Sequence, residues 1–211
     1  MNQVVERAAS AANGFLGLAV IVALFLVGIA LVIYAGVSES ILPLVLGLLG
    51  VIAGPTLAGG LVAVQPNQAR VLTFFGSYAG SVRNAGFWWV NPFTVKKAVS
   101  LRVRNFTSER VKVNDADGNP VEIAAVVVWR VAESAKAVFD VDDYEEFVAI
   151  QSETALRGLA TRYPYDAAGE KRARPPERPV ALAAALRAEP EEQMQAAGVD
   201  VIEARVTHLD D

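Results

Sequence analysis

The sequence predicts an α+β protein in which an N-terminal transmembrane hairpin precedes a domain of antiparallel β-strands packed with helices. Residues 1–64 contain two long apolar runs and only three charged side chains, Glu6, Arg7 and Glu39. Residues 65–131 contain short segments of alternating apolar and polar residues separated by Gly, Pro and Asn, the pattern of half-buried strands. Helical spacing follows, and a last strand comes after it. This order is typical of α+β domains and not of wound α/β sheets.

The two apolar runs are residues 14–37 and 41–64, and each has 24 residues without a charge. As helices rising about 1.5 Å per residue they extend ~36 Å, against a hydrocarbon core of roughly 30 Å. A secretory signal peptide is the alternative for the first run. We favour a membrane segment, because the run is too long for a signal peptide and a second run follows at once.

The second run is less regular than the first. Pro43 lies near its start, where proline is tolerated, and Pro55 is expected to break or kink the helix in its last third. The sequence leaves open whether this run spans the membrane or re-enters on one side. Gly50 and Gly54 form a GxxxG match, which we interpret as coincidental because glycine is common in membrane helices.

Charges around the runs predict the orientation. Arg7 precedes the first run, only Glu39 lies in the linker, and four cations follow the second run: Arg70, Arg83, Lys96 and Lys97. The positive-inside rule therefore places both ends in the cytoplasm. The expected organisation is a cytoplasmic tail (1–13), two membrane segments (14–64) and one domain (65–211).

Composition excludes several classes of function. Residues 65–211 carry 18 Lys and Arg against 21 Asp and Glu, a net charge of −3. No basic field is therefore expected to recruit nucleic acid or an anionic surface. The chain has no cysteine, which excludes disulfides, thiolate metal sites and a cysteine nucleophile. No Walker loop or dinucleotide fingerprint is present, and no cofactor is expected.

The soluble part begins with strands. Alternation and flanking turn residues predict strands at 69–75, 87–90, 99–103, 111–113 and 121–131. In the last of these, Val121, Ile123, Ala125, Val127, Trp129 and Val131 share one face. Val126 and Val128 add apolar surface to the other face, so this strand is expected to be covered on both sides.

Helical spacing predicts helices at 132–139, 144–162 and 180–197, with a surface loop at 167–179. The buried stripe expected for the second helix is Phe147, Ile150, Thr154, Leu156 and Leu159. Gly198 is expected to end the third helix. A strand at 199–209 should place Ile202, Ala204 and Val206 on one face.

Several groups of polar residues suggest chemistry, and a structural explanation is stronger for each. Asp115, Asp117 and Asn119 imitate a calcium loop, but Pro120 and Val126 stand where glycine and glutamate are needed, so we favour a hairpin turn. The acids at 140–146 fit a capped helix start. His208, the one histidine, is expected to pack on the last strand, which leaves no two-His metal site or Ser-His pair with a choice of partners. The basic side chains of residues 171–178 suit a solvated loop, with lipid head groups or a partner as the alternative.

An aromatic stretch is the best functional candidate in the sequence. Phe87, Trp88, Trp89 and Phe93 follow the last apolar run by about 20 to 30 residues. Tryptophan favours the headgroup layer of a membrane. Adjacent residues on a strand point to opposite faces, so we expect one tryptophan in the core and one toward lipid.

The domain resembles the SPFH or band 7 superfamily of stomatins, prohibitins, flotillins and the bacterial HflK/HflC proteins, most of all the bacterial stomatin- and prohibitin-like members. The residues that carry the resemblance are 64–76 directly after the membrane segment, 84–93 as a counterpart of the family's GPGLHFxxP stretch, 99–102, 113–130, 155–157 and 197–205. Ala85 departs from the family's proline, and Trp88-Trp89 replaces a Leu-His type pair. Members usually continue into an Ala/Glu-rich coiled coil that drives ring or cage assembly, which is not found up to Asp211.

The resemblance implies a membrane-anchored scaffold without enzymatic activity. Such a protein would associate with the bilayer and with itself, with self-association expected to need the region after Asp211. It would organise a membrane microdomain or regulate a client such as a membrane protease or an NfeD-like membrane protein. The alternatives are a monomeric adaptor for one client and, with less support from the residues, a membrane-bound hydrolase.

Overall fold

The computed structural model describes residues 4–38, 40–114, 120–162 and 194–210. It is an α+β structure with antiparallel sheets, which confirms the predicted fold class. The elements follow in the order β1 (Ala12–Asn13), α1 (Gly14–Ser38), α2 (Ile41–Ala58), β2 (Leu61–Val64), β3 (Gln68–Phe74), β4 (Ser77–Val82), β5 (Gly86–Trp89), β6 (Val95–Ser100), β7 (Arg104–Thr107), β8 (Val111–Asn114), β9 (Pro120–Val131), α3 (Ser134–Phe139), α4 (Tyr144–Arg162) and β10 (Val199–Asp210).

The chain divides into two compact units. One comprises Glu6–Ser100, and the other comprises Leu101–Asp211 with the first five residues. The helical hairpin and strands β1 to β6 therefore form one unit, which we call the anchor unit. Strands β7 to β10 belong to the other, which we call the distal unit because it lies farther from the N-terminal helices along the sequence.

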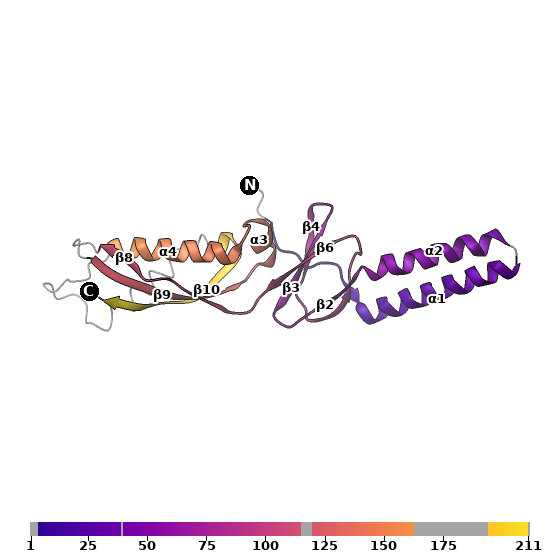
Figure 1. The fold of residues 1–211 in the computed structure, drawn as a ribbon, viewed down its shortest axis with the longest axis horizontal. Helices are drawn as coiled ribbons and strands as arrows, with labels where there is room; N and C mark the ends of the chain where they lie inside the picture. Colours follow the sequence, from indigo (N-terminus) through magenta and orange to yellow (C-terminus); the bar gives the residue numbers. More distant parts are fainter. Residues whose placement is uncertain (1–3, 39, 115–119, 163–193, 211) are drawn as a thin grey trace. The chain divides into compact units, whose positions relative to one another are not determined.

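In the anchor unit, α1 and α2 run antiparallel and side by side (Figure 1). α1 matches the first apolar run to within one residue. The second run behaves differently from the prediction, because α2 ends at Ala58 and residues 61–64 form strand β2. Gly59 and Gly60 separate the two elements, and a glycine pair lacks the side chains that favour continuation of a helix.

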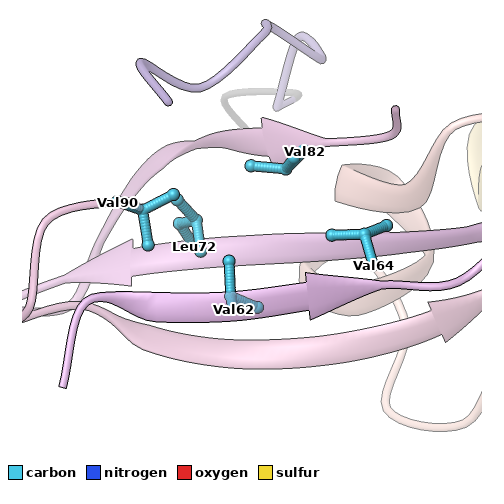
Figure 2. Close-up of a cluster of buried hydrophobic side chains, with 5 residues drawn as sticks. All are labelled: Val62, Val64, Leu72, Val82 and Val90. Atoms are coloured by element: carbon cyan, nitrogen blue, oxygen red, sulfur yellow. The ribbon is translucent and has the colours of Figure 1, made fainter. Parts of the chain in front are cut away.

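Two three-stranded sheets complete the anchor unit, with strand orders β1-β5-β2 and β4-β3-β6. Side chains from both sheets and from the residue that follows β5 form one buried cluster (Figure 2): Val62, Val64, Leu72, Val82 and Val90. Ala9, Ala11 and Trp88 pack against its margin. Strands β1 and β4 are absent from the sequence-based prediction, since neither shows a clear apolar alternation.

The register of the strands around residue 100 also differs from the prediction. Of the expected strand 99–103, only Val99 and Ser100 lie in a strand, at the end of β6, and β7 starts after it at Arg104. Val103 is exposed. The alternation of Val99, Leu101 and Val103 thus reflects the end of one strand and a connection, because the chain passes there from the anchor unit to the distal unit.

In the distal unit, β9 is the central strand and pairs with β10, β7 and β8. As predicted, Ala125, Val127, Trp129 and Val131 are buried on one face. β10 carries register shifts between Val201 and Glu203 and between Val206 and His208. The first shift leaves Ile202 exposed and corrects its predicted place beside buried Ala204, because a bulge interrupts the period of two.

Helix α4 has the predicted bounds and buries Leu156 as predicted, but the rest of its buried stripe differs. Val148, Ser152, Ala155 and Leu156 are buried, whereas Ile150 and Thr154 are exposed. The helix is therefore rotated by about one residue relative to the prediction. The side chain of Leu159, most of the helix predicted at 180–197, and the loop predicted at 167–179 lie outside the described residues. Residues 194–196 are helical, and Gly198 adopts a φ of +72° directly before β10.

Candidate membrane-anchoring site

The outer surface of the helical hairpin is apolar. α1 and α2 are both long and apolar enough to cross a membrane. Large side chains such as Phe15, Ile33 and Ile52 are exposed on them. Apolar surface of this extent is unfavourable in water and favourable against lipid tails. The protein is therefore a membrane-anchored protein, held through its N-terminal helices.

Glycines set the distance between the two helices. A Cβ on Gly28 would lie 2.8 Å from the backbone nitrogen of Val51 and 2.9 Å from the carbonyl oxygen of Gly47. Gly50 and Gly54 are buried on the same face of α2 as Gly47. The backbones can approach this closely only because these positions have no side chain. The interpretation of the GxxxG match as coincidental is therefore wrong.

Strand β5 pairs with the flanks of both helices. β1 precedes α1 directly, and its Ala12 pairs with Trp89. β2 follows α2, and its Leu61 pairs with the same Trp89. The side chain of Asn13 accepts hydrogen bonds from the first turn of α1, 2.9 Å from Phe15 N, and so caps the helix. One short strand therefore connects the start and the end of the hairpin.

The two adjacent tryptophans of β5 occupy different surroundings. Trp88 packs against the buried cluster, and its Nε1 donates to the carbonyl of Asn84 at 2.9 Å. Trp89 lies against the hairpin, where a Cβ on Gly17 would be 2.9 Å from the Trp89 Cβ. Its Nε1 donates to the carbonyl of Leu57, near the end of α2, at 3.0 Å. Both indoles are half-buried.

Of the other aromatic candidates, one contacts the hairpin and one is exposed. Phe87 packs edge-on against Phe15 of α1, with ring centroids 5.2 Å apart. A Cβ on Gly14 would collide with the Phe87 ring, so the first turn of α1 is closely fitted to β5. Phe93 is 63% exposed and follows β5 in the connection to β6.

Phe93 belongs to a group of exposed apolar residues whose other members are not among the candidates found in the sequence. Phe74 ends β3 and Phe75 follows it in the turn to β4, with the two rings 4.7 Å apart, and Phe75 is 87% exposed. Val95, 72% exposed, pairs with Thr73 directly before that turn. We call Phe74, Phe75, Phe93 and Val95 the apolar rim. An aromatic pair beside Gly76 is the signal in the sequence that indicates it.

The chain before α1 is an ordered part of the anchor unit. Ala9 N donates to Ser81 O at 3.0 Å, and Ser81 N donates to Arg7 O at 2.9 Å. Arg83 forms an ion pair with Glu6 at 3.3 Å. We call residues 6–13 the N-terminal strap. Together with Val82, Asn84 and Trp88 it lines a cavity of about 510 Å³.

A lysine lies at the end of α2. Lys96 Nζ donates to the carbonyl of Gly59 at 2.8 Å and to that of Thr94 at 3.1 Å. A cation suits this position, because the last carbonyls of a helix lack intrahelical partners and carry partial negative charge. Burial lowers the pKa of Lys96 below its ordinary value.

The two prolines differ in their position in α2. Pro43 is in the first turn, where its missing N–H has no intrahelical partner to lose. Pro55 lies inside the helix, which continues past it to Ala58. The Thr56 hydroxyl donates to Ile52 O at 2.9 Å beside it. A bend of the helix at Pro55 stays a prediction.

The remaining candidates have structural explanations where the structure describes them. Asp143 Oδ1 accepts from Glu145 N at 2.8 Å and from Glu146 N at 3.2 Å, so it caps α4 as expected for the acidic group. Within residues 4–38, 40–114, 120–162 and 194–210, no three acidic or histidine side chains come together as a metal site. The side chain of His208, the turn at 115–119 and the basic loop at 171–178 lie outside the described residues.

The distal unit contains an arginine between two aromatic rings. The Arg104 guanidinium lies 5.8 Å from the ring centroid of Trp129 and 5.9 Å from that of Tyr144, and it forms an ion pair with Glu145. Desolvation raises the pKa of Tyr144, Arg104 acts in the opposite direction, and the nearby acids Glu145 and Asp143 add to the rise. These contacts join β7, β9 and the start of α4.

A comparison with protein-family models identifies one match that covers most of the chain. Residues 62–211 match the model described as SPFH domain / Band 7 family. No match is found among the curated proteins. The matched region starts at β2. It therefore includes part of the anchor unit and the part of the distal unit that runs from Leu101 to Asp211.

Proposed function

The chain belongs to the SPFH / band 7 family, and on that premise we propose that it is a membrane-anchored scaffold without enzymatic activity, which self-associates. Members of this family are generally scaffolds of membranes, and they typically associate with lipids and with one another. The proposed role is to organise a membrane microdomain or to regulate a client such as a membrane protease or an NfeD-like membrane protein. The proposed location is the cytoplasmic side of the cell membrane, for the N-terminus and the SPFH domain alike.

The observation that carries the proposal is the pairing of β5 with both β1 and β2. Because one strand connects the start of α1 to the end of α2, the hairpin cannot open without breaking a sheet. The anchor unit is thus built to keep the beginning of the SPFH domain beside the membrane. A membrane-held platform of this kind suits a scaffold.

The apolar rim supports contact of the domain itself with the bilayer. It lies near the base of the hairpin, since Lys96, next to Val95, bonds to Gly59 just after α2. Aromatic side chains such as Phe75 and Phe93 favour the boundary between headgroups and acyl chains. We propose that these residues, together with Phe87, Trp88 and Trp89, lie at the membrane surface.

A fractionation experiment tests the scaffold proposal. The protein is expressed at low level, membranes are collected without detergent, and intact membranes are treated with a photoactivated cross-linker that reacts without preference for a residue type. The expected result is recovery in the pellet and cross-linked species of two or more chains. A protein found in the soluble fraction would contradict membrane anchoring. A pelleted protein without cross-linked species would contradict self-association and favour a monomeric adaptor.

Tryptophan fluorescence tests whether the apolar rim contacts the bilayer. In liposomes containing lipids with brominated acyl chains, tryptophan emission from the anchor unit should be quenched. A Phe75→Ser, Phe93→Ser variant should show weaker quenching, because the domain then lies less deeply. Ile150→Ser, which removes an exposed apolar side chain from the distal unit, is the matched control and should leave the quenching unchanged. Equal quenching in all three proteins would exclude the proposed contact.

A further inference from the structure

The charge of the protein is divided between its two units. Residues 65–100 contain four cations, Arg70, Arg83, Lys96 and Lys97, and no acidic side chain. Residues 101–211 contain 14 Lys and Arg against 21 Asp and Glu. The net charge of −3 for residues 65–211, which by itself predicts no attraction to anionic surfaces, is therefore the sum of a positive part and a negative part.

Two of these cations are adjacent on the edge strand β6. β6 pairs with β3 on one side and is last in the order β4-β3-β6. Lys96 Nζ bonds to Gly59 O and Thr94 O, which accounts for two of its three N–H donors. Lys97 is exposed and points to the opposite face of the strand. Neither lysine forms an ion pair with any described residue.

The position of β6 indicates the layer of the membrane that it reaches. Lys96 contacts Gly59, the first residue after α2, at 2.8 Å. The 18 residues of α2 extend about 27 Å, slightly less than a hydrocarbon core of roughly 30 Å. The end of α2 therefore lies near the headgroups. Phe93 and Val95, which precede Lys96 in the chain, are exposed apolar residues of the rim.

We propose that strand β6 binds the phosphate groups of anionic phospholipids through Lys96 and Lys97. The ammonium groups meet the phosphates while the rim beside them enters the acyl boundary. This inference deepens the proposed membrane anchoring and rests on it. It specifies the chemical class of lipid that gathers around the anchor unit, namely phospholipids with net negative charge.

The protein would thereby change the composition of the lipids around it. A cation near an anionic membrane surface contributes about 1 kcal/mol, so each lysine enriches anionic lipid roughly fivefold. Contacts of this kind weaken as salt shortens the range of the electrostatic attraction. A scaffold that self-associates would add these local enrichments together over a patch.

Energy transfer in liposomes tests the proposal. The full chain is reconstituted in neutral phosphatidylcholine containing a trace of either phosphatidylglycerol or phosphatidylcholine with the same acyl-chain fluorophore. Transfer from the tryptophans should be roughly 25-fold greater to the labelled phosphatidylglycerol, because two lysines contribute about fivefold each. The Lys96→Gln, Lys97→Gln variant should lose this preference, and 0.5 M salt should reduce it in the unchanged protein.

Two further variants keep the result interpretable. Lys97→Gln alone removes a side chain without a described contact, so it should lower the preference about fivefold with no effect on folding. Lys112→Gln, an exposed lysine of the distal unit paired with Glu122, is the matched control and should keep the full preference. All variants should still pellet with membranes and cross-link, which separates this inference from the proposed function.

Two outcomes would overturn the inference. One is equal transfer to both labelled lipids in the unchanged protein. The other is a preference for phosphatidylglycerol that persists in the Lys96→Gln, Lys97→Gln variant. If cross-linking also falls in that variant, β6 contacts the acidic distal unit of a second copy and not a phosphate.

Discussion

The indole nitrogen of Trp89 lies 3.0 Å from the carbonyl oxygen of Leu57 and donates a hydrogen bond to it. The carbonyl also accepts from Gly60 N at 3.0 Å. Carbonyls in the last turn of a helix lack intrahelical partners, so the bond from Trp89 helps to cap α2. The strand that pairs with both flanks of the hairpin thus also completes the end of its second helix.

Trp89→Phe should loosen the end of α2. The substitution keeps an aromatic ring against Gly17 but removes the donor to Leu57, at a cost of about 1 kcal/mol. Hydrogen exchange in detergent micelles should become faster at the amides of residues 58–61. Trp88→Phe is the control, because its lost bond ends on Asn84 outside the helix. Faster exchange at 58–61 in both variants would show that the Leu57 contact is not the cause.

Gly28→Leu should separate the helices. A Cβ at this position would meet backbone atoms of Val51 and Gly47 at 2.8 and 2.9 Å, and backbone cannot rotate away as a side chain can. Overpacking of this kind costs about 1–3 kcal/mol. The midpoint of thermal unfolding in micelles should fall. Gly36→Leu, in the same helix with no heavy atom within 4 Å, should leave it unchanged or raise it.

Gly80→Ala should release the N-terminal strap. Gly80 has a φ of +132°, and a Cβ on it would lie 2.7 Å from Ala9 Cα. Trypsin should then cleave after Arg7 several times faster, as measured by mass spectrometry. Gly76→Ala is the matched control, because Gly76 also has a positive φ (+83°) but nothing within 4 Å. If both variants are cleaved equally fast, backbone strain and not the strap contact determines the rate.

Arg104→Gln should destabilise the distal unit. The guanidinium lies over Trp129 and Tyr144 and pairs with Glu145, and a partly buried contact of this kind contributes about 1–2 kcal/mol. The free energy of unfolding from urea titration should fall by that amount. Arg130→Gln, which removes a more exposed ion pair with Asp200, should cost under ~1 kcal/mol. Equal losses would show that the aromatic rings add nothing.

The phenol of Tyr144 should make the distal unit less stable in alkali. Desolvation raises its pKa in the folded state above the ordinary value of 10.0. The folded protein therefore keeps this proton to higher pH than the unfolded chain does. The stabilisation is complete below pH 10 and is lost as the pH rises from 10 toward the folded-state pKa. Thermal unfolding at pH 9 and pH 11 should show a smaller difference for Tyr144→Phe than for the unchanged protein.

Some parts of the structure follow from local sequence patterns. α1 and the start of α2 follow from the length of uncharged apolar runs, because a helix pairs the backbone N–H and C=O groups of such a run within the run itself. The bounds of α4 and the buried face of β9 follow from periods of 3.6 and 2. The tryptophans of β5 are candidates from the sequence alone, because tryptophan close to a membrane segment favours the headgroup layer. These properties depend on neighbours along the chain.

Other parts depend on neighbours in space. The place of β5 between β1 and β2, the strap on β4 and the bond from Lys96 to Gly59 join residues that are far apart in the sequence. Strand pairing is selected by the total free energy of packing, and no local pattern encodes it. The apolar runs by themselves determined that this protein enters a membrane. The tertiary structure alone decided that both ends of its anchor meet on one strand, because only folding brings Ala12 and Leu61 to either side of Trp89.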